Sequence, residues 1–496
     1  MTMAANNAQR LATGIPGLDP ILEGGLLVGG VYVVQGPPGS GKTILANQLC
    51  CHQARSGRRA IYFTLLSESH AAMFAHLKRM DFFCGDLIGD AVVYFSGFKI
   101  LEDEGLGGLA RMVGKTMADR APSVVVIDGF ATATDASRVP SDLKQFIRQV
   151  QTFSASVGCT TLLINSARPG AAIQPEHTIV DGIFELSDEL NGLQSLRHLQ
   201  VRKMRGTRQI RGCHSMEIND HGIVVHPRFE SGSHRALPSH RSAVATAARR
   251  GFGIAELDAM MMGGVPSGST TMLLGPSGTG KTALMLQFLA AGADADETGL
   301  FFGMYEQPDA LLAKAARIHV GLARGVDAGK IHLTWERPIE GVLDALADRL
   351  LDQVRTTGAT RLCIDGMHSL FRTVDFPDRM RAVTAALAER LANLGVTTVY
   401  SVETADLVGA TGAAIRVPID DLSAMTHNLV ALRTIERDDR FDRVLAILKM
   451  RDSDYDRSIR ELEITDCGIV VAPLRRTARP RPGARNGRNP AKARTR

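Results

Sequence analysis

The sequence predicts an α/β protein of two similar domains in tandem, each a mostly parallel β-sheet flanked by helices. Short, continuously apolar runs such as residues 123–127 alternate with longer amphipathic stretches such as residues 143–153, which is the pattern of buried parallel strands connected by helices. The length of 496 residues, with 45% hydrophobic and 22% charged residues, is typical of a soluble chain with more than one core. A glycine-rich motif also occurs twice, which indicates a duplication.

The glycine-rich motif fits the phosphate-binding loop G-x-x-x-x-G-K-[ST] in both copies. Its glycines let backbone N–H groups surround phosphates, its lysine reaches the outer phosphates, and its threonine hydroxyl is a ligand for Mg²⁺. An apolar run precedes each copy and a helix-like run follows it, so strand, loop and helix start together predict an anion site rather than a glycine-rich turn that binds nothing. The two copies are Gly36, Pro37, Pro38, Gly39, Ser40, Gly41, Lys42 and Thr43, and Gly275, Pro276, Ser277, Gly278, Thr279, Gly280, Lys281 and Thr282.

Other landmarks recur in the same order around the two loops. An opening motif G-I-x-x-L-D ends at Asp19 and again at Asp258, and this offset of 239 residues also separates Lys42 from Lys281. Late in the chain, K-M-R and D-x-G-I-V-V recur at an offset of 246. We therefore predict a first domain over residues 10–227, a linker over 228–250, a second domain over 251–473 and a disordered basic tail over 474–496.

Two carboxylate positions complete the predicted chemistry of each domain. Asp128 and Asp365 each end an apolar strand, where a Walker B carboxylate holds Mg²⁺ together with the loop threonine; the alternative is an ordinary turn residue. Glu68 and Glu306 each follow an apolar strand about 25 residues beyond the loop lysine, and a carboxylate there can orient or deprotonate the attacking nucleophile. The alternative is a glutamate that complements a helix dipole.

A basic pair late in each domain is the remaining candidate. Lys203 with Arg205, and Lys449 with Arg451, lie far along the chain from the loop of their own domain. In ring ATPases such a pair reaches the nucleotide of the neighbouring subunit and stabilises charge in the transition state. The alternative is a set of exposed strand charges.

The formal net charge of +5 belongs to the carboxyl-terminal end. Residues 475–496 contain nine Arg or Lys and no Asp or Glu, so the rest of the chain carries −4. With its Pro, Gly and Asn content this tail is predicted to be disordered. It is the one part expected to touch nucleic acid, and the alternative is a solubilising extension.

Composition also bears on compartment. No run of 18 apolar residues appears, and residues 1–10 lack the order of a signal peptide, so we expect a cytoplasmic protein without a membrane span. The seven cysteines have no C-x-x-C spacing, and we expect buried free thiols.

Over residues 11–471 the chain resembles the KaiC family, which are double-domain ATPases of the RecA/DnaB superfamily. The opening motif, the paired phosphate loops and the K-M-R and D-x-G-I segments carry the resemblance. It implies two RecA-like domains, ATP as the nucleotide, a two-tiered hexamer with ATP at subunit interfaces, ATPase activity in the first tier and Ser/Thr autophosphorylation in the second. The acceptor stretch of the family matches residues 421–426, so that Ser423 falls on the acceptor serine and Thr426 is a second candidate.

Three departures separate the chain from clock members of that family. The paired glutamates are single here, at Glu68 after Ser67 and at Glu306 after Tyr305, and Ala424 replaces the adjacent acceptor threonine. The arginine-rich tail differs from an acidic, partner-binding end, so KaiA and KaiB are not assumed as partners.

We therefore expect an ATP- and Mg²⁺-dependent ATPase ring with autokinase activity at Ser423 and an unidentified signalling partner. One alternative is a DNA-dependent recombinase or helicase, against which the net acidic core and the missing basic or aromatic loops after the Asp128 and Asp365 strands both argue. The other is a scaffold switched by ATP, without kinase activity.

Overall fold

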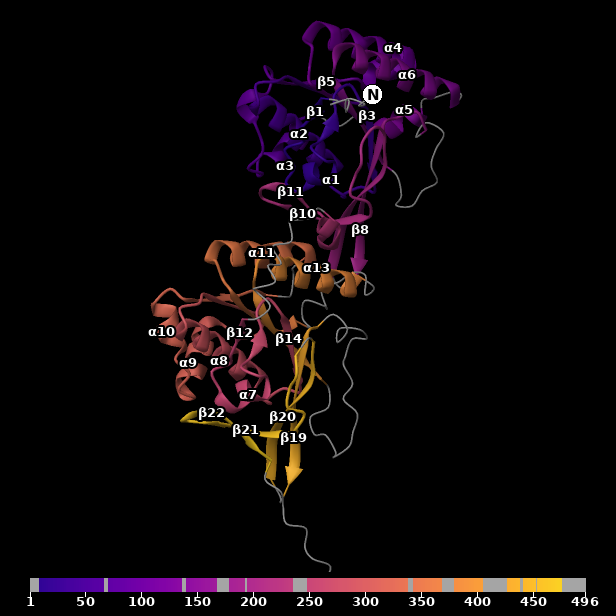
Figure 1. Ribbon diagram of the computed structural model, residues 1–496. Coiled ribbons are helices and arrows are strands. Elements are labelled where there is room, and N and C mark those ends of the chain that lie inside the picture. Colours follow the sequence, from indigo (N-terminus) through magenta and orange to yellow (C-terminus); the bar gives the residue numbers. More distant parts are fainter. Residues whose placement is uncertain are drawn as a thin grey trace, which may run out of the picture. The chain divides into compact units, whose positions relative to one another are not determined.

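The computed structural model describes residues 9–66, 70–135, 140–166, 178–191, 194–234, 248–337, 342–367, 379–404, 426–437, 440–451 and 453–474. The chain divides into two compact units (Figure 1). The first consists of Met1–Leu237 with Gly341–Arg349 and Thr373–Leu387, and the second of Pro238–Glu340, Leu350–Arg372 and Ala388–Arg496. Short stretches of the second sequence repeat thus belong to the first compact unit.

The first repeat contains eleven strands among its described residues, and its helices alternate with the central ones. The strands are β1 Arg10–Leu11, β2 Leu26–Leu27, β3 Val31–Gly36, β4 Ala60–Thr64, β5 Val92–Ser96, β6 Val124–Asp128, β7 Thr160–Ser166, β8 Gly182–Asn191, β9 Gln194–Met204, β10 Cys213–Asn219 and β11 Gly222–His226. The helices are α1 Leu18–Ile21, α2 Lys42–Arg55, α3 His70–Leu77, α4 Phe98–Arg120, α5 Phe130–Asp135 and α6 Pro140–Val157, with 3₁₀ turns at Gly85–Leu87 and Phe229–His234.

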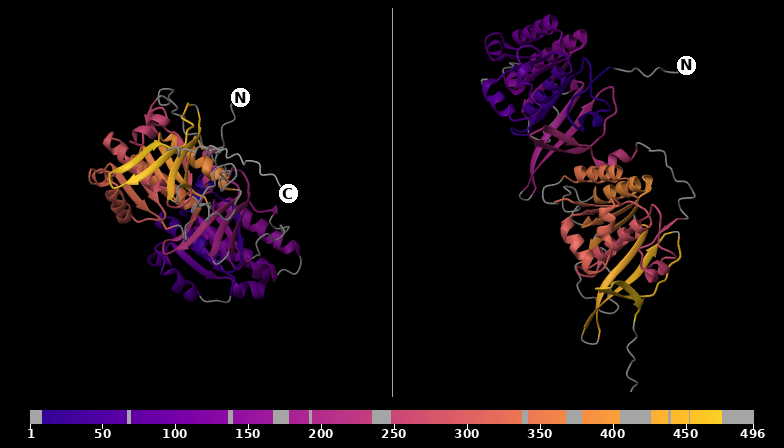
Figure 2. Two further views of the ribbon diagram at one scale, coloured as in Figure 1. Left: turned by 90° about the horizontal axis from the view of Figure 1, so that it is seen from below. Right: turned by 90° about the vertical axis from the view of Figure 1, so that its left-hand side faces the viewer.

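The second repeat follows the same order. Its strands are β12 Arg249–Arg250, β13 Val265–Pro266, β14 Thr270–Gly275, β15 Gly299–Gly303, β16 Ile331–Trp335, β17 Arg361–Asp365, β18 Thr397–Glu403, β19 Asn428–Arg437, β20 Arg440–Met450, β21 Arg460–Thr465 and β22 Gly468–Pro473. Its helices are α7 Ala255–Met260, α8 Lys281–Asp294, α9 Pro308–Arg317, α10 Leu322–Asp327, α11 Leu343–Thr357 and α13 Arg379–Asn393. Figure 2 shows the strands β19–β22 in yellow from two further directions.

Within the described residues, each repeat forms a nine-stranded sheet of the same topology. The orders are β11-β10-β9-β8-β3-β7-β6-β4-β5 and, in the reverse direction, β16-β15-β17-β18-β14-β19-β20-β21-β22. Six strands from β8 to β5, and from β19 to β16, pair in parallel, and the other three continue as antiparallel strands. The predicted fold class, two tandem RecA-like domains with mostly parallel sheets, is confirmed.

Strand composition explains this arrangement. Side chains of β3 that point to one face, such as Val34, pack with α2, and those that point to the other, such as Val33, pack with α4 and α6. Both faces are therefore apolar, because a parallel sheet is covered on both sides. Figure 1 shows α4 and α6 side by side and α2 apart from them.

In each repeat, a carboxylate and an arginine form hydrogen bonds that hold the opening motif in place. Asp19 accepts hydrogen bonds from the Thr13 N–H and hydroxyl, and Asp258 accepts them from two backbone N–H groups. Arg10 donates to the carbonyl oxygens of Leu22 and Gly25 and to Thr207 Oγ1. In the second repeat the equivalent donor is Arg249, whose acceptors are the Met261 and Gly264 carbonyl oxygens and Ser453 Oγ.

One expectation needs correction, and one predicted segment has contacts that the sequence did not indicate. A disulfide joins Cys51 and Cys84, so the prediction of free thiols is wrong for this pair, whereas Cys50, Cys159 and Cys363 are buried and free. The predicted linker starts with a fixed segment, because Phe229 is 2% exposed and its neighbours form ion pairs. Within this linker, residues 235–247 lie outside the described part, as does the predicted tail from Arg475 onward.

Candidate nucleotide sites

Both glycine-rich motifs connect a central strand to the start of a helix. The first runs from the end of β3 to α2, and the second from the end of β14 to α8. The residue before each helix, Gly41 or Gly280, has a φ of 96° or 101°, which only glycine adopts readily. A Cβ added at Gly41 would lie 2.7 Å from Ile218 Cδ1, so glycine is also required for close packing.

Each loop lysine turns back onto its own loop. Lys42 Nζ donates to the carbonyl oxygens of Gly36 and Pro37 at 2.9 and 2.7 Å, and Lys281 Nζ makes the two equivalent bonds at 2.7 Å. Burial lowers the pKa of both lysines, and the nearby aspartate at the strand end opposes this shift. The two ammonium groups are thus held where a phosphate would approach the loop.

The loop threonine and the aspartate at the strand end meet in both repeats. Thr43 Oγ1 donates to Asp128 Oδ2 at 3.2 Å, and Thr282 Oγ1 to Asp365 Oδ2 at 2.8 Å. The aspartates are 8% and 7% exposed. In phosphate-loop proteins, Mg²⁺ is held by such a threonine hydroxyl and a nearby aspartate carboxylate. Mg²⁺ bound in this way would take its remaining ligands from phosphate and water.

A second donor holds each aspartate, and the sequence analysis missed both donors. Tyr62 OH donates to Asp128 Oδ2 at 2.6 Å, whereas Ser401 Oγ donates to Asp365 Oδ1 at 2.5 Å. Burial raises the pKa of Tyr62 well above its ordinary value, with a further contribution from Asp128, so the phenol keeps its proton. A polar residue within an apolar strand next to the loop strand is the signal that could have revealed these residues.

The two donors occupy different positions of the fold. Strand pairing places Phe301 of β15 where Tyr62 lies in β4, and Ile164 of β7 where Ser401 lies in β18. The two repeats also differ two residues further along the same strand. Glu403 of β18 pairs with Gly275 in the second repeat, whereas the first repeat has Ser166 of β7 opposite Gly36. The second site thus has an additional carboxylate, Glu403; burial lowers the pKa of Lys281, and the charge of Glu403 opposes part of this lowering.

A pocket of about 600 Å³ opens over the second loop. Glu306 lies on its wall and forms an ion pair with Lys314 of α9. The pocket is lined by Ser277, Gly278, Gly280, Lys281, Thr282, Ala283, Tyr305, Glu306, Lys314, Ile318, Asp365, Gly366, Ser401, Glu403 and Ile464. The predicted base, loop lysine and metal ligands of this repeat therefore share one cavity.

The two predicted bases differ by one residue in their sequence distance from the preceding strand. Thr64 and Gly303 pair with Asp128 and Asp365, respectively, and so are equivalent. Glu306 is the third residue after Gly303, but Glu68 is the fourth after Thr64. Relative to the preceding strands, Glu68 therefore comes one residue later than Glu306. Glu68 itself lies outside the described residues.

The late basic pairs lie at the opposite edge of the sheet from their own loops. Lys203 is level with Ile183 near the start of β8, and donates to the Thr178 and Val180 carbonyl oxygens. Arg205 is exposed and donates to the carbonyl oxygens of Thr178 and Ile179. The pair is level with the start of β3, and the loop follows the end of this strand. The six residues of β3, at a rise of about 3.3 Å per residue, therefore separate the pair from its own loop.

The second basic pair has the same placement and adjoins the predicted acceptor stretch. Lys449 donates to the Thr426 carbonyl oxygen at 2.8 Å, and the Arg451 N–H donates to the His427 carbonyl oxygen. Thr426 is 1% exposed and its hydroxyl shares a hydrogen bond with Tyr400 OH. This burial speaks against Thr426 as a phospho-acceptor, and Ser423 lies outside the described residues.

Among the described residues, no helix combines the length and the apolar composition that a membrane crossing requires.

Comparison with known proteins places this geometry in a family. The family model described as KaiC ATPase matches residues 11–230 and again 251–476. The circadian clock oscillator protein KaiC of Picosynechococcus sp. is 23% identical over 479 residues, which cover 94% of this chain and 90% of that protein. KaiC of Synechococcus elongatus is 23% identical, with 94% and 91% covered. The circadian clock protein KaiC3 of Synechocystis sp. is 25% identical, with 93% and 92% covered. The chain belongs to the KaiC family of ATPases.

Proposed function

We propose that this chain is a Mg²⁺-dependent ATPase with two nucleotide sites and that its second site also phosphorylates Ser423. Copies of the chain form a ring, expected to be a hexamer. The ring acts in signalling or timing together with a protein partner. The observation that carries the proposal is the repeated triad of loop lysine, loop threonine and strand-end aspartate. A domain boundary after residue 227 and another near residue 251 are part of the same proposal.

The residues of the triad divide the work of phosphoryl transfer. The lysine would release its loop carbonyl oxygens and bind the outer phosphates, while backbone N–H groups of the loop bind the others. Mg²⁺ held by the threonine and the aspartate would neutralise phosphate charge. In the second site Glu306, from the wall of the same pocket, would accept a proton from the attacking hydroxyl and orient it in line.

Assembly follows from where the basic pairs lie. Lys449 and Arg451 adjoin Thr426 and His427, which is the edge of the sheet where β14 begins, since His427 N–H donates to Thr270. Lys281 is bound at the other end, at Gly275, about 16 Å away at 3.3 Å per residue. The basic pair therefore serves the nucleotide of a neighbouring copy, and a ring brings the two edges together.

The same placement supports transfer to Ser423 between copies. Ser423 precedes Thr426 by three residues in the sequence, and Thr426 accepts a hydrogen bond from Lys449. Transfer to Ser423 would therefore use the nucleotide of a neighbouring copy, as proposed for the basic pair. The relatives are named clock proteins, and the signalling or timing role proposed here rests on that likeness.

The experiment follows labelled γ-phosphate from ATP in the full chain. The expected result is free phosphate together with label on the peptide that contains residues 420–433, assigned by mass spectrometry. Lys281→Ala and Ser423→Ala should remove the peptide label, because one loses the second site and the other the acceptor. Lys42→Ala should halve nucleotide stoichiometry and leave the peptide label in place.

Thr411→Ala, another hydroxyl residue of the same segment, is the matched control and should keep the label. Free phosphate without any label on this peptide would reduce the protein to an ATPase. Neither product, with ATP still bound, would instead identify a scaffold switched by nucleotide.

A further inference from the structure

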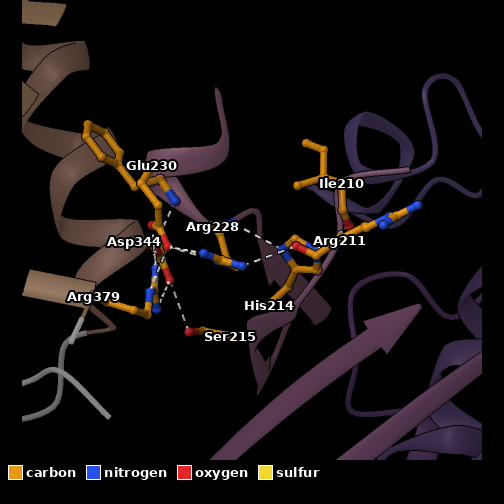
Figure 3. A network of polar contacts seen from close by, with 9 residues as sticks. Ile210, Arg211, His214, Ser215, Arg228, Glu230, Asp344 and Arg379 are labelled. Carbon is orange, nitrogen blue, oxygen red and sulfur yellow. Dashed lines mark hydrogen bonds and ion pairs between the residues drawn. The ribbon is translucent and has the colours of Figure 1, made fainter. Parts of the chain in front are cut away.

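The segment that follows the first repeat is held in a cleft between the starts of α11 and α13. The Phe229 N–H donates to Asp344 Oδ1 at 2.9 Å. Arg379 donates to both carboxylate oxygens of Glu230 at 3.0 and 2.9 Å and to Asp344 Oδ1 at 2.6 Å. Figure 3 shows Arg228 and Arg379 directed at Glu230 from two sides. All of these residues belong to the first compact unit.

This contact is well buried. Asp344 is fully buried, and the side chains of Glu230 and Arg379 are 9% and 14% exposed. Since a bidentate arginine–carboxylate pair is both strong and geometrically specific, Glu230 and Arg379 fix the segment in the cleft.

The first repeat has a cleft at the equivalent place, and it is a pocket of about 530 Å³. Asp128 is equivalent to Asp365 and β7 to β18, at an offset of 237 residues. By this offset, Gly107 of α4 is equivalent to Asp344, and Asp142 of α6 to Arg379. Both line the pocket, which is formed by Leu101, Glu102, Asp103, Glu104, Gly105, Leu106, Gly107, Asp142, Gln145, Phe146 and Gln149.

The first-repeat cleft is acidic, and the charge at the position of Arg379 is reversed. Four of its lining residues are carboxylates, and one of them, Glu104, forms an exposed ion pair with Arg111. Among the described residues, Glu102, Asp103 and Asp142 have no ion pair with a basic side chain. Where the second repeat presents Arg379, the first presents Asp142.

The segment that follows the second repeat also carries the opposite charge from the segment that follows the first. The strands β11 and β22 start at Gly222 and Gly468, an offset of 246 residues. By this offset, Arg476 is equivalent to Glu230, and Arg475 to Phe229. Both arginines lie outside the described residues and begin a stretch of nine basic and no acidic residues. The described pair Glu230–Arg379 thus corresponds to a pair Arg476–Asp142 with exchanged charges.

We propose that the segment beginning at Arg475 and Arg476 of one chain binds the acidic first-repeat cleft of a second copy. In the described contact, a repeat donates its final segment to the repeat that follows it in the chain. In the proposed contact, the first repeat of another copy takes the place of that following repeat. Such a head-to-tail contact joins copies in series, in addition to the ring, and its occupant is a basic peptide recognised by carboxylates.

Charge reversal of the full chain tests this proposal. Arg476→Glu and Asp142→Arg should each weaken concentration-dependent association, measured by sedimentation velocity with nucleotide present, by about 10-fold. A one-to-one mixture of these two variants should associate again, since the unmodified segment of the Asp142→Arg chains then meets the unmodified cleft of the Arg476→Glu chains. Association of the unmodified chain should fall as salt is raised.

Arg488→Glu and Asp86→Arg are the matched controls, because they make the same charge changes at positions without an equivalent in the described contact. They should leave association unchanged. Equal effects of Arg488→Glu and Arg476→Glu would overturn the proposal in favour of nonspecific attraction. Rescue in the double variant of a single chain, without rescue in the mixture, would overturn it in favour of binding within one chain.

Discussion

The nucleotide sites of the two repeats share a backbone but differ in the side chains around the aspartate. In the first, Tyr62 and Thr43 both donate to the same oxygen of Asp128. In the second, Thr282 and Ser401 donate to different oxygens of Asp365. The duplication therefore kept the loop, the strand order and the register, while the second hydrogen bond to the aspartate comes from another strand.

The clefts differ in the same manner. The cleft of the second repeat contains Arg379 and Glu230, and the cleft of the first contains Asp142 at the position of Arg379. Equivalent backbone thus carries opposite charge. This teaches that the two repeats are specialised through a few side chains at matched positions, so each difference can be tested by exchanging residues.

The largest effect is expected from the basic pairs, which should act alike in both repeats. Arg205→Ala should lower turnover of the first site, and Arg451→Ala that of the second, by about 10³-fold, because each removes a charge that stabilises the transition state of a neighbour. Turnover is measured with the other loop inactivated by Lys281→Ala or Lys42→Ala. Nucleotide binding should be retained.

Arg208→Ala, an exposed arginine three residues from Arg205, is the control and should leave turnover unchanged. Mixed rings of Arg205→Ala and Lys42→Ala chains should regain activity, since some interfaces then hold both intact elements. Absence of rescue in verified mixed rings would show that the pair acts within its own chain.

The next largest effect is the pH dependence of the contact between Glu230 and Arg379, which the first-repeat cleft lacks. Burial would raise the pKa of Glu230, but hydrogen bonds from Arg379 and Arg228 outweigh it and lower the pKa to about 2. Since the pKa in the folded state lies below the ordinary value of 4.5, this carboxylate stabilises the fold above pH about 4.5, by up to about 3 kcal/mol. The contribution is lost as the pH falls from about 4.5 towards about 2.

Hydrogen exchange of the Phe229 amide, which donates to Asp344, measures this loss. Glu230→Gln should reduce its protection at pH 7 and make no difference near pH 2. Asp352→Asn, which breaks an exposed ion pair on α11, should change little at either pH. Equal protection in Glu230→Gln and the unmodified chain at pH 7 would contradict the assigned role.

The smallest effect concerns the donors that hold the aspartates. Tyr62→Phe should raise the Mg²⁺ concentration needed by the first site about 10-fold, and Ser401→Ala should do so for the second, because a lost hydrogen bond to a charged group leaves the carboxylate free to turn. Mn²⁺ binding in the presence of nucleotide, followed by electron paramagnetic resonance, reports the same change without turnover.

Tyr32→Phe and Ser269→Ala remove buried hydroxyls elsewhere and serve as controls. Adding Ile164→Ser to Tyr62→Phe places a serine at the position that Ser401 occupies in the second repeat, and should restore Mg²⁺ dependence. If both controls shift the Mg²⁺ requirement as much as the variants do, the donors have no special role.

Motifs gave the phosphate loops, the strand-end aspartates and the fold class, because glycine spacing and apolar strands report backbone geometry directly. Pairing of Tyr62 with Asp128 across 66 residues has no local signature, since it depends on which strands become neighbours. The offset between Glu68 and Glu306 is 238 residues rather than the 239 of the loop lysines, and strand register places this one-residue difference after β4 and β15.

The cleft of Glu230 was missed for a related reason. Residues 228–250 have no periodicity, which predicts a linker, yet Phe229 and Glu230 are held by Asp344 and Arg379 from more than 100 residues away. A single buried residue and a single ion pair suffice to fix such a segment, and neither produces a repeating pattern.

The arginine that precedes each opening motif sets a practical limit on where the chain can be cut. Arg249 donates to Gly264 and to Ser453, two residues beyond Arg451. A fragment of the second repeat that begins at Phe252 would lack this arginine and leave the turn after Arg451 untied, although every strand of its nine-stranded sheet would be present. A fragment intended to report on Arg451 should therefore begin at or before Arg249, and one intended to report on Arg205 at or before Arg10.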